Sequence, residues 1–226
     1  MPPTTPAARA WMPPPTEGAM PEHVHGAAVP SAPAAFRPDP AGWVPAARRV
    51  PSPNFDARPA GLPVDLVVIH NISLPPGQFG SGDIEAFFQN RLDPSRHPFF
   101  ATIHEVRVSA HFLVTRTGEL VQFVSCLDRA WHAGQSEFLG RPRCNDFSIG
   151  IEIEGSDDQP FTLAQYHTAA ALVRALLAAY PVRALAGHSD IAPGRKTDPG
   201  PHFDWAAFAA AAGLASGMLP YRKGRP

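Results

Sequence analysis

Two segments that lie far apart in the sequence carry the residue types of a catalytic metal site. The first is an apolar run that ends in His70, and the second is the Pro/Gly-rich stretch 187–201, which contains His188 and Asp198. Two histidines and a carboxylate form a ligand set for Zn²⁺, and a site with three protein ligands keeps a fourth position for water. The sequence therefore predicts a metal-assisted hydrolase.

Hydrolysis of an amide needs further groups, and the sequence offers candidates for them. A carboxylate beside the metal can take a proton from water and pass it to the leaving nitrogen. Glu152 and Glu154 are candidates because they alternate with isoleucines, and an unpaired carboxylate is costly to bury. The two glutamates share one face of a strand, so spacing does not choose between them. Lys196 could stabilise an oxyanion, with a solvated surface lysine as the alternative.

Short strands must position these groups. Residues 64–69 are mostly apolar and β-branched, which predicts a buried strand that leads to His70. Residues 182–186 predict a second strand, which leads to His188. Residues 147–153 alternate with a period of two, which predicts the strand that carries the glutamates. Side chains at the ends of such strands gather at one side of a sheet, where sites commonly lie.

The rest of the pattern completes an α/β chain. Two further strands are predicted at 108–115 and 120–125, with a hairpin over 116–119. Helices are predicted from residue 83 toward 92, from a capping box at 162–165 to the residue before Pro181, and over 203–212. This alternation predicts a mixed central β-sheet flanked by helices.

Composition sets limits on partners and location. The 226 residues carry a net charge of −1 with a pI of about 6.8, so no global basic field is present to hold nucleic acid. No apolar run approaches the ~20 residues that cross a bilayer, and no secretory signal pattern is found. Cys126 and Cys144 could pair, but two idle thiols in a reducing compartment are the favoured interpretation. The chain is predicted to be cytoplasmic, with neither nucleic acid nor a membrane as a partner.

The domain boundaries follow from a change in composition. Residues 1–40 contain 11 of the 28 prolines and little apolar periodicity, which is typical of a disordered tail. The catalytic domain is predicted over residues 41–215, and residues 216–226 are predicted to form a C-terminal tail.

Several ordered stretches resemble one known family closely. The similarity runs from about Trp43 through Ala212 and is identified as that of the AmpD family, the zinc-dependent 1,6-anhydro-N-acetylmuramyl-L-alanine amidases of peptidoglycan recycling. The stretches that carry it are 47–54, 70–77, 107–111, 129–134, 143–152 and 188–201, followed by Phe203-Asp204-Trp205. The Pro/Ala-rich extension before Trp43 is a departure from the compact members of the family.

The resemblance implies a role for particular residues. It implies one Zn²⁺ per chain held by His70, His188 and Asp198, with Glu152 as the catalytic acid and base and Lys196 as the oxyanion stabiliser. It further implies substrate contacts to the anhydro sugar or the peptide at Asn71, Arg107, Trp131, His132 and Arg143.

The resemblance also implies a fold, a reaction and a substrate. The fold is the one shared with peptidoglycan-recognition proteins. The reaction is hydrolysis of the amide between the lactyl group of anhydro-N-acetylmuramic acid and L-alanine of the stem peptide, in a cytoplasmic enzyme expected to be a monomer.

Two other classes of protein and one related enzyme are alternatives to this interpretation. A module that binds muropeptides without cleaving them would have little need of Glu152 and Lys196 beside a complete ligand set. A structural zinc domain more often has four Cys/His ligands. A periplasmic amidase of the same family would differ mainly in having an export signal.

Overall fold

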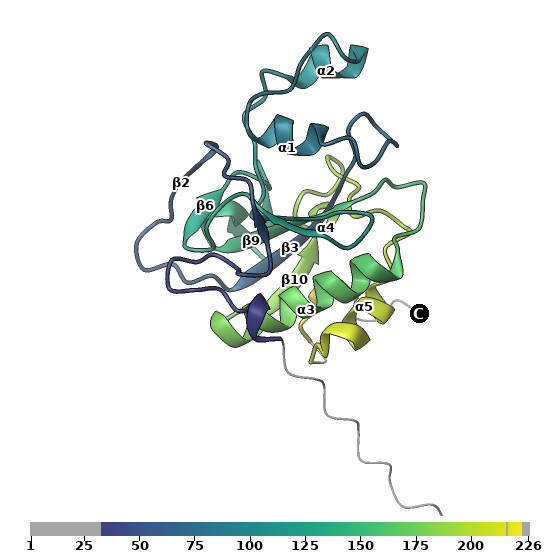
Figure 1. Cartoon of the computed structure of the whole chain (residues 1–226). Helices are drawn as coiled ribbons and strands as arrows, with labels where there is room; N and C mark the ends of the chain where they lie inside the picture. The colour runs from purple at the N-terminus through teal and green to yellow at the C-terminus, as the bar shows by residue number, and fades with distance from the viewer. Residues whose placement is uncertain (1–32, 216, 223–226) are drawn as a thin grey trace, which may run out of the picture.

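The computed structural model describes residues 33–215 and 217–222 and is organised around one six-stranded sheet (Figure 1). The strand order is β1 (Arg48–Arg49), β5 (Leu120–Gln122), β4 (Phe112–Val114), β9 (Ser148–Glu154), β3 (Leu66–Ile72) and β10 (Ala184–Gly187). Strands β4 and β5 pair antiparallel and the other neighbours pair parallel. The predicted mixed central sheet is therefore confirmed.

Strand register brings three predicted site residues to the same end of this sheet. In the parallel pair β3 and β9, His70 lies directly opposite Glu152. Strand β10 pairs with the other side of β3, with Gly187 opposite Ile69, so that His188 follows beside His70. Because parallel strands end on the same side of a sheet, their terminal side chains meet there.

The two faces of β9 have different compositions, as the period of two predicts. One face packs into the largest core cluster through Ile149, Ile151 and Ile153. The opposite face carries the smaller and polar residues Ser148, Gly150, Glu152 and Glu154. The candidate site lies on this second face, which carries Glu152.

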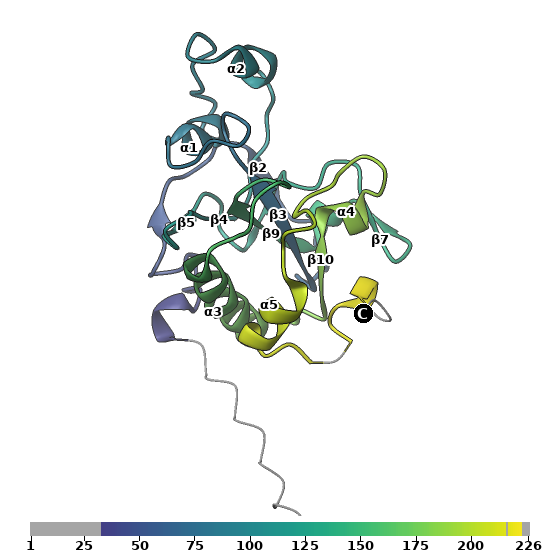
Figure 2. The same cartoon turned by 90° about the vertical axis from the view of Figure 1, so that its right-hand side faces the viewer.

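Two helices cover the apolar face of the sheet. Helix α3 (Leu163–Ala179) begins at a capping box in which Thr162 accepts from the backbone N–H of Gln165, as predicted. It packs against α5 (Trp205–Ala212), and Figures 1 and 2 show the two helices together on one side of the sheet.

The other side of the sheet is covered by shorter elements. Helices α1 (Asp83–Phe88) and α2 (Pro98–Ile103) lie there, and Phe88 and Phe100 belong to a second core cluster beneath them (Figure 1). Two small sheets pair β2 (Phe55–Ala57) with β6 (Asp128–Ala130) and β7 (Glu137–Phe138) with β8 (Arg141–Pro142). The remaining short elements are η2 (Cys144–Asp146) and α4 (His188–Ile191).

The described structure extends past both predicted domain boundaries. Residues 1–32 of the predicted tail lie outside the described residues, but Ala34–Phe36 form a 3-10 helix, η1, and Phe36 packs against the main core cluster. At the other end Pro220–Arg222 form η3, and Arg222 makes an ion pair of 2.7 Å with Asp190. Segments assigned from composition to the tails are thus packed on the domain.

Two predicted strands are shorter than expected. Only Leu120–Gln122 of the stretch 120–125 form β5. Only Phe112–Val114 of the stretch 108–115 form β4. The Ser109 N–H donates outside the sheet, to the Trp131 carbonyl at 3.2 Å, whereas the His111 N–H still donates to the Gly150 carbonyl of β9 at 3.1 Å. The alternating pattern therefore continues through a segment that leaves the regular ladder.

The structure shows the state of the two cysteines and the lengths of the helices. Cys126 and Cys144 are both free and buried, and they lie in different core clusters. Burial raises the pKa of the Cys126 thiol to about 12, which makes it an inert thiol at neutral pH. Within residues 33–215 and 217–222, no helix has the length and apolar character needed to span a membrane.

Candidate metal centre and groove

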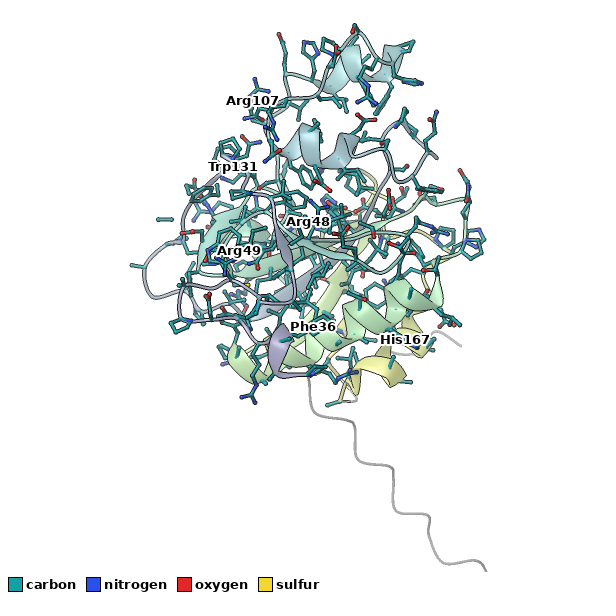
Figure 3. All side chains as sticks on the ribbon, viewed as in Figure 1. Phe36, Arg48, Arg49, Arg107, Trp131 and His167 are labelled. Carbon is teal, nitrogen blue, oxygen red and sulfur yellow. The ribbon has the colours of Figure 1, made fainter. Side chains whose placement is uncertain are left out.

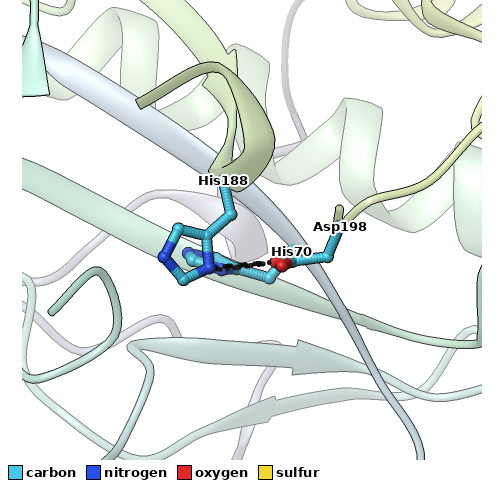
Figure 4. A group of neighbouring side chains, drawn as sticks. All are labelled: His70, His188 and Asp198. Atoms are coloured by element: carbon cyan, nitrogen blue, oxygen red, sulfur yellow. Dashed lines mark hydrogen bonds and ion pairs between the residues drawn. The ribbon is translucent and has the colours of Figure 1, made fainter. Parts of the chain in front are cut away.

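His70, His188 and Asp198 converge although more than a hundred residues separate the first from the other two (Figure 4). Their nearest ligand atoms all lie within 4.8 Å of one another. The His70 Nδ1 atom is 3.0 Å from both His188 Nδ1 and Asp198 Oδ2, and His188 Nδ1 is 3.1 Å from Asp198 Oδ2. The structure therefore brings together the three residues that the sequence analysis proposed as ligands.

The loop that carries Asp198 is held by contacts with the end of β10. The Ser189 N–H donates to the Asp198 carbonyl at 2.9 Å, which ties the loop to the start of α4. A Cβ atom at Gly187 would lie 2.8 Å from Pro199 Cδ, so only glycine leaves room for the loop. The absence of a side chain at Gly187 is thus a condition for placing Asp198 beside the histidines.

The donor set itself points to a cation. His188 Nε2 lies 3.0 Å from the Ala133 carbonyl, which can only accept a hydrogen bond, so this nitrogen carries the proton. His188 Nδ1 therefore presents a lone pair to the Asp198 carboxylate, and the two would repel without a cation between them. Burial lowers the pKa of His70 to about 4, which keeps that ring neutral as well. Neutral imidazoles and a carboxylate are the ligands that Zn²⁺ takes.

Glu152 and Glu154, which spacing alone could not separate, have different partners. Glu154 Oε1 accepts from the Gly80 N–H at 2.6 Å and Oε2 accepts from the Arg116 N–H at 2.8 Å. Glu152 Oε2 is buried and accepts no hydrogen bond from the described residues. Burial, together with the charge of Asp198, raises the pKa of Glu152 well above its ordinary value. A buried carboxyl group with a raised pKa is typical of a catalytic acid or base.

An open groove of about 500 Å³ is lined by Asp198, one of the three converging residues. Lys196 is exposed and lines this groove with Asn71, Asp157 and Asp198. The positive charge of Lys196 partly counteracts the rise in the pKa of Glu152. The ammonium group of Lys196 and the carboxyl group of Glu152 thus lie close to the candidate metal position.

Asn71 lies in the groove but its amide nitrogen is already engaged. It donates to Asp157 Oδ1 at 2.7 Å and to the Pro199 carbonyl at 3.1 Å, which links the end of β3 to the residue after Asp198. Asp157 was not among the residues that the sequence analysis selected. It lies in a polar loop after β9, and no pattern in that loop marks it out.

Three other candidate substrate contacts lie outside this groove. Arg107 is exposed and donates to the His104 carbonyl at 3.0 Å, and Trp131 is half-buried (Figure 3). Arg143 is also exposed and makes an ion pair of 2.9 Å with Asp146. Its backbone has a φ of 61°, a left-handed conformation that is uncommon for residues other than glycine. None of these three residues is among those that line the groove with Lys196 and Asn71.

The ring of His132, another expected substrate contact, lies against His70 and Ser148. Its Nδ1 lies 2.9 Å from His70 Nε2, on the side of that ring that faces away from Asp198. Its Nε2 lies 3.1 Å from Ser148 Oγ. Both ring nitrogens therefore have hydrogen-bond partners inside the protein.

Comparison with known proteins places this geometry in a family. The model of the N-acetylmuramoyl-L-alanine amidase family matches residues 60–201, more than half of the chain. The 1,6-anhydro-N-acetylmuramyl-L-alanine amidase AmpD of Escherichia coli (strain K12) is 58% identical over 169 residues, which make up 74% of this chain and 92% of that protein.

Solved structures agree with this assignment. A crystal structure of a selenomethionine derivative of AmpD matches with a TM-score of 0.74 and 55% identity, covering 76% of this chain and 97% of that chain. The amidase AmiD from E. coli, in complex with the substrate anhydro-N-acetylmuramic acid-L-Ala-D-γ-Glu-L-Lys, matches with a TM-score of 0.51 and 30% identity, covering 70% and 60%. The chain therefore belongs to the N-acetylmuramoyl-L-alanine amidase family, as an AmpD-type member, and is an amidase.

Proposed function

We propose that this amidase uses one zinc ion, held by His70, His188 and Asp198, to cleave anhydro-muropeptides during peptidoglycan recycling. The scissile bond is the amide between the lactyl group of anhydro-N-acetylmuramic acid and L-alanine of the stem peptide. The observation that carries the proposal is the convergence of two histidine Nδ1 atoms and a carboxylate oxygen within 4.8 Å. The AmpD relatives carry the name of this activity, and AmiD was solved with such a substrate.

The residues around the three ligands have separate roles in this proposal. When bound, zinc supplies Lewis acidity and lowers the pKa of water. Glu152 takes the proton of the attacking water at its free oxygen, Oε2, and delivers it to the leaving nitrogen of L-alanine. Lys196 offers its ammonium group to the oxyanion that forms on the lactyl carbonyl.

The proposed substrate contacts are held by other parts of the chain. Asn71 contributes its amide oxygen, since its nitrogen is bound to Asp157 and Pro199. Arg107, Trp131 and Arg143 are proposed to contact the sugar or the carboxylates of the peptide, for which exposed guanidinium groups are suited. The enzyme is proposed to act as a cytoplasmic monomer on a small muropeptide, with neither nucleic acid nor a membrane as a partner.

Hydrolysis of anhydromuramyl-tripeptide by the purified full chain tests the proposal. We expect mass spectrometry to find free tripeptide and anhydromuramic acid, and we expect a chelator to abolish their formation until Zn²⁺ is restored. In Glu152→Gln the rate should fall by at least about 100-fold while bound zinc is retained, because general acid–base catalysis contributes 10²–10⁴-fold. Binding of the substrate without release of tripeptide, in the zinc-loaded wild-type chain, would contradict the proposal.

A further inference from the structure

A continuous line of hydrogen bonds leads from the His70 ring to a backbone carbonyl behind the site. His70 Nε2 contacts His132 Nδ1 at 2.9 Å, and His132 Nε2 contacts Ser148 Oγ at 3.1 Å. Ser148 Oγ then lies 2.6 Å from the carbonyl oxygen of Cys144. Ser148 is fully buried, so its hydroxyl finds its partners inside the protein.

The direction of every bond in this line follows from its last member. The Cys144 carbonyl can only accept, so the Ser148 hydroxyl donates to it. Ser148 Oγ must then accept from His132 Nε2–H, which leaves His132 Nδ1 without a proton in the neutral ring. His132 Nδ1 therefore accepts from His70 Nε2–H. The proton of His70 is thereby held on the atom that faces away from Asp198.

This arrangement leaves His70 Nδ1 as a lone pair at the candidate metal position. His188 reaches the same state independently, because its Nε2–H donates to the Ala133 carbonyl. The backbone around these groups is itself fixed, since Asn145 Oδ1 accepts from the N–H of His132 at 3.2 Å and of Ala133 at 2.8 Å. One side chain thus holds the two groups that orient the two histidines.

Gly150 provides the space in which the His132 ring lies. A Cβ atom at this position would lie 2.4 Å from His132 Cγ and 2.6 Å from His132 Nδ1, too close for any ordinary contact. Gly150 lies within β9 on the same face as Ser148. Glycine weakens a strand interior, and one of its uses there is to admit the close approach of another group.

We propose that His132 is a positioning residue for the metal site, which fixes the tautomer and orientation of His70 through the Ser148–Cys144 line, rather than a contact for the substrate. The inference rests on the proposed zinc site and adds to it the residue that supports one ligand from behind. Outer hydrogen-bond partners of metal-bound histidines set the tautomer and basicity of the ligand, and their loss typically costs 10–100-fold in metal affinity or activity.

The test measures zinc affinity rather than turnover. Metal-free full-length protein is titrated with Zn²⁺ in competition with a chromophoric chelator, and circular dichroism confirms that each variant is folded. His132→Leu removes the acceptor for His70 Nε2–H while it keeps apolar volume, and we expect zinc affinity to fall by about 10- to 100-fold. His132→Asn places an amide oxygen about where Nδ1 lies, and we expect this variant to recover most of the lost affinity. Recovery by asparagine would not occur if the ring served only to fill space.

A second pair of variants makes the test independent of substitution at His132. Gly150→Ala displaces the His132 ring and should weaken zinc binding in the same direction. Gly155→Ala is the matched control, because its Cβ would meet Phe161 Cε1 at 2.4 Å, and it should disturb packing without a loss of zinc affinity. If His132→Leu fails to fold, this pair decides the question.

The outcomes separate the inference from the proposed function. If the wild-type chain binds no zinc, the metal site itself is wrong and the inference falls with it. If the wild-type chain binds zinc and His132→Leu binds it equally well, only the positioning role is overturned. A rise in KM with unchanged zinc affinity would return His132 to the group of substrate contacts.

Discussion

Glu152 and Glu154 lie two residues apart on one face of β9, yet their carboxyl groups have opposite surroundings. The oxygens of Glu154 accept from the backbone N–H groups of Gly80 and Arg116, which fully satisfies a buried carboxylate. Glu152 has a buried oxygen without such a partner, and its pKa is raised well above the ordinary value by burial and by Asp198. Glu154 therefore links two loops, whereas the surroundings of Glu152 favour its protonated form.

Because their surroundings differ, substitution of Glu152 and of Glu154 by glutamine should have opposite effects on the stability of the metal-free protein. Because the folded-state pKa of Glu152 is raised, the folded protein binds the proton more tightly than the unfolded chain, and its stability falls as pH rises above the unfolded value of about 4.3. Glu152→Gln should thus be more stable than wild type at neutral pH, by about 1.4 kcal/mol per unit of pKa shift. The gain should disappear below about pH 4, as urea unfolding across pH would measure.

Glu154→Gln is the matched comparison for that experiment. An amide nitrogen cannot accept from a backbone N–H, so one buried donor loses its partner, at a cost of about 1–3 kcal/mol at neutral pH. Equal effects of the two substitutions would contradict the distinction between the two glutamates.

At the scale of the element, the strands supply the functional side chains of the site, and their glycines leave room for neighbouring groups. Strand β3 ends at the site with His70, and β9 carries Glu152 opposite it in register. Gly150 in β9 and Gly187 in β10 admit the ring of His132 and the loop at Pro199. Helix α3 contributes no candidate site residue. It packs on the apolar face of the sheet and stabilises it through buried leucines and alanines. Changes in α3 should therefore affect stability without affecting catalysis.

The capping box of α3 offers a test of that separation. Thr162 Oγ1 accepts from the Gln165 N–H at 3.2 Å and donates to the Arg116 carbonyl at 2.9 Å. Thr162→Ala should lower the free energy of unfolding by about 1 kcal/mol, because an N-cap residue is lost. Thr162→Ser retains the hydroxyl and should behave as wild type. The rate of substrate hydrolysis should be unchanged in both variants, and a large loss of rate in Thr162→Ala would show that α3 is coupled to the site.

At the scale of the whole molecule, both ends of the described chain pack back on the amidase domain. Phe36 in η1 contacts the main core cluster. Arg222 in η3 stacks on the Trp205 ring at 4.6 Å and pairs with Asp190, whose carboxylate accepts the Gly187 N–H at 2.8 Å. The C-terminal segment thus supports the turn that leads into His188.

Two truncations of the N-terminal segment test where the domain begins. Deletion of residues 1–32 should leave both the hydrolysis rate and the stability close to those of the full chain. Deletion of residues 1–40 removes Phe36 and Asp39, which accepts from the Trp43 N–H at 2.9 Å, and should cost about 1–2 kcal/mol of stability because apolar burial is lost. Thermal unfolding with a parallel activity assay measures both effects. Equal stability of the two truncated forms would show that η1 contributes nothing.

Much of the fold could be predicted because its elements have clear local signals. The alternating isoleucines of β9, the apolar run of β3 and the capping box of α3 each specify an element from neighbouring residues alone. The strand at 108–115 was predicted too long because the Ser109 N–H bonds outside the sheet, to the distant Trp131 carbonyl, which no local pattern reveals. The packing of Phe36 on the domain could not be predicted for the same reason, since it depends on a core built from remote segments.

By itself the sequence determined the α/β class, the sheet, the family resemblance and the residue types at the site, because these depend on local periodicity and on ordered motifs. Only the tertiary structure decided what each buried polar group faces. It gave Glu152 and Glu154 different partners, and it placed the ring of His132 against His70. Hydrogen-bond direction and burial depend on atoms brought together from distant parts of the chain, and a linear pattern contains no record of such neighbours.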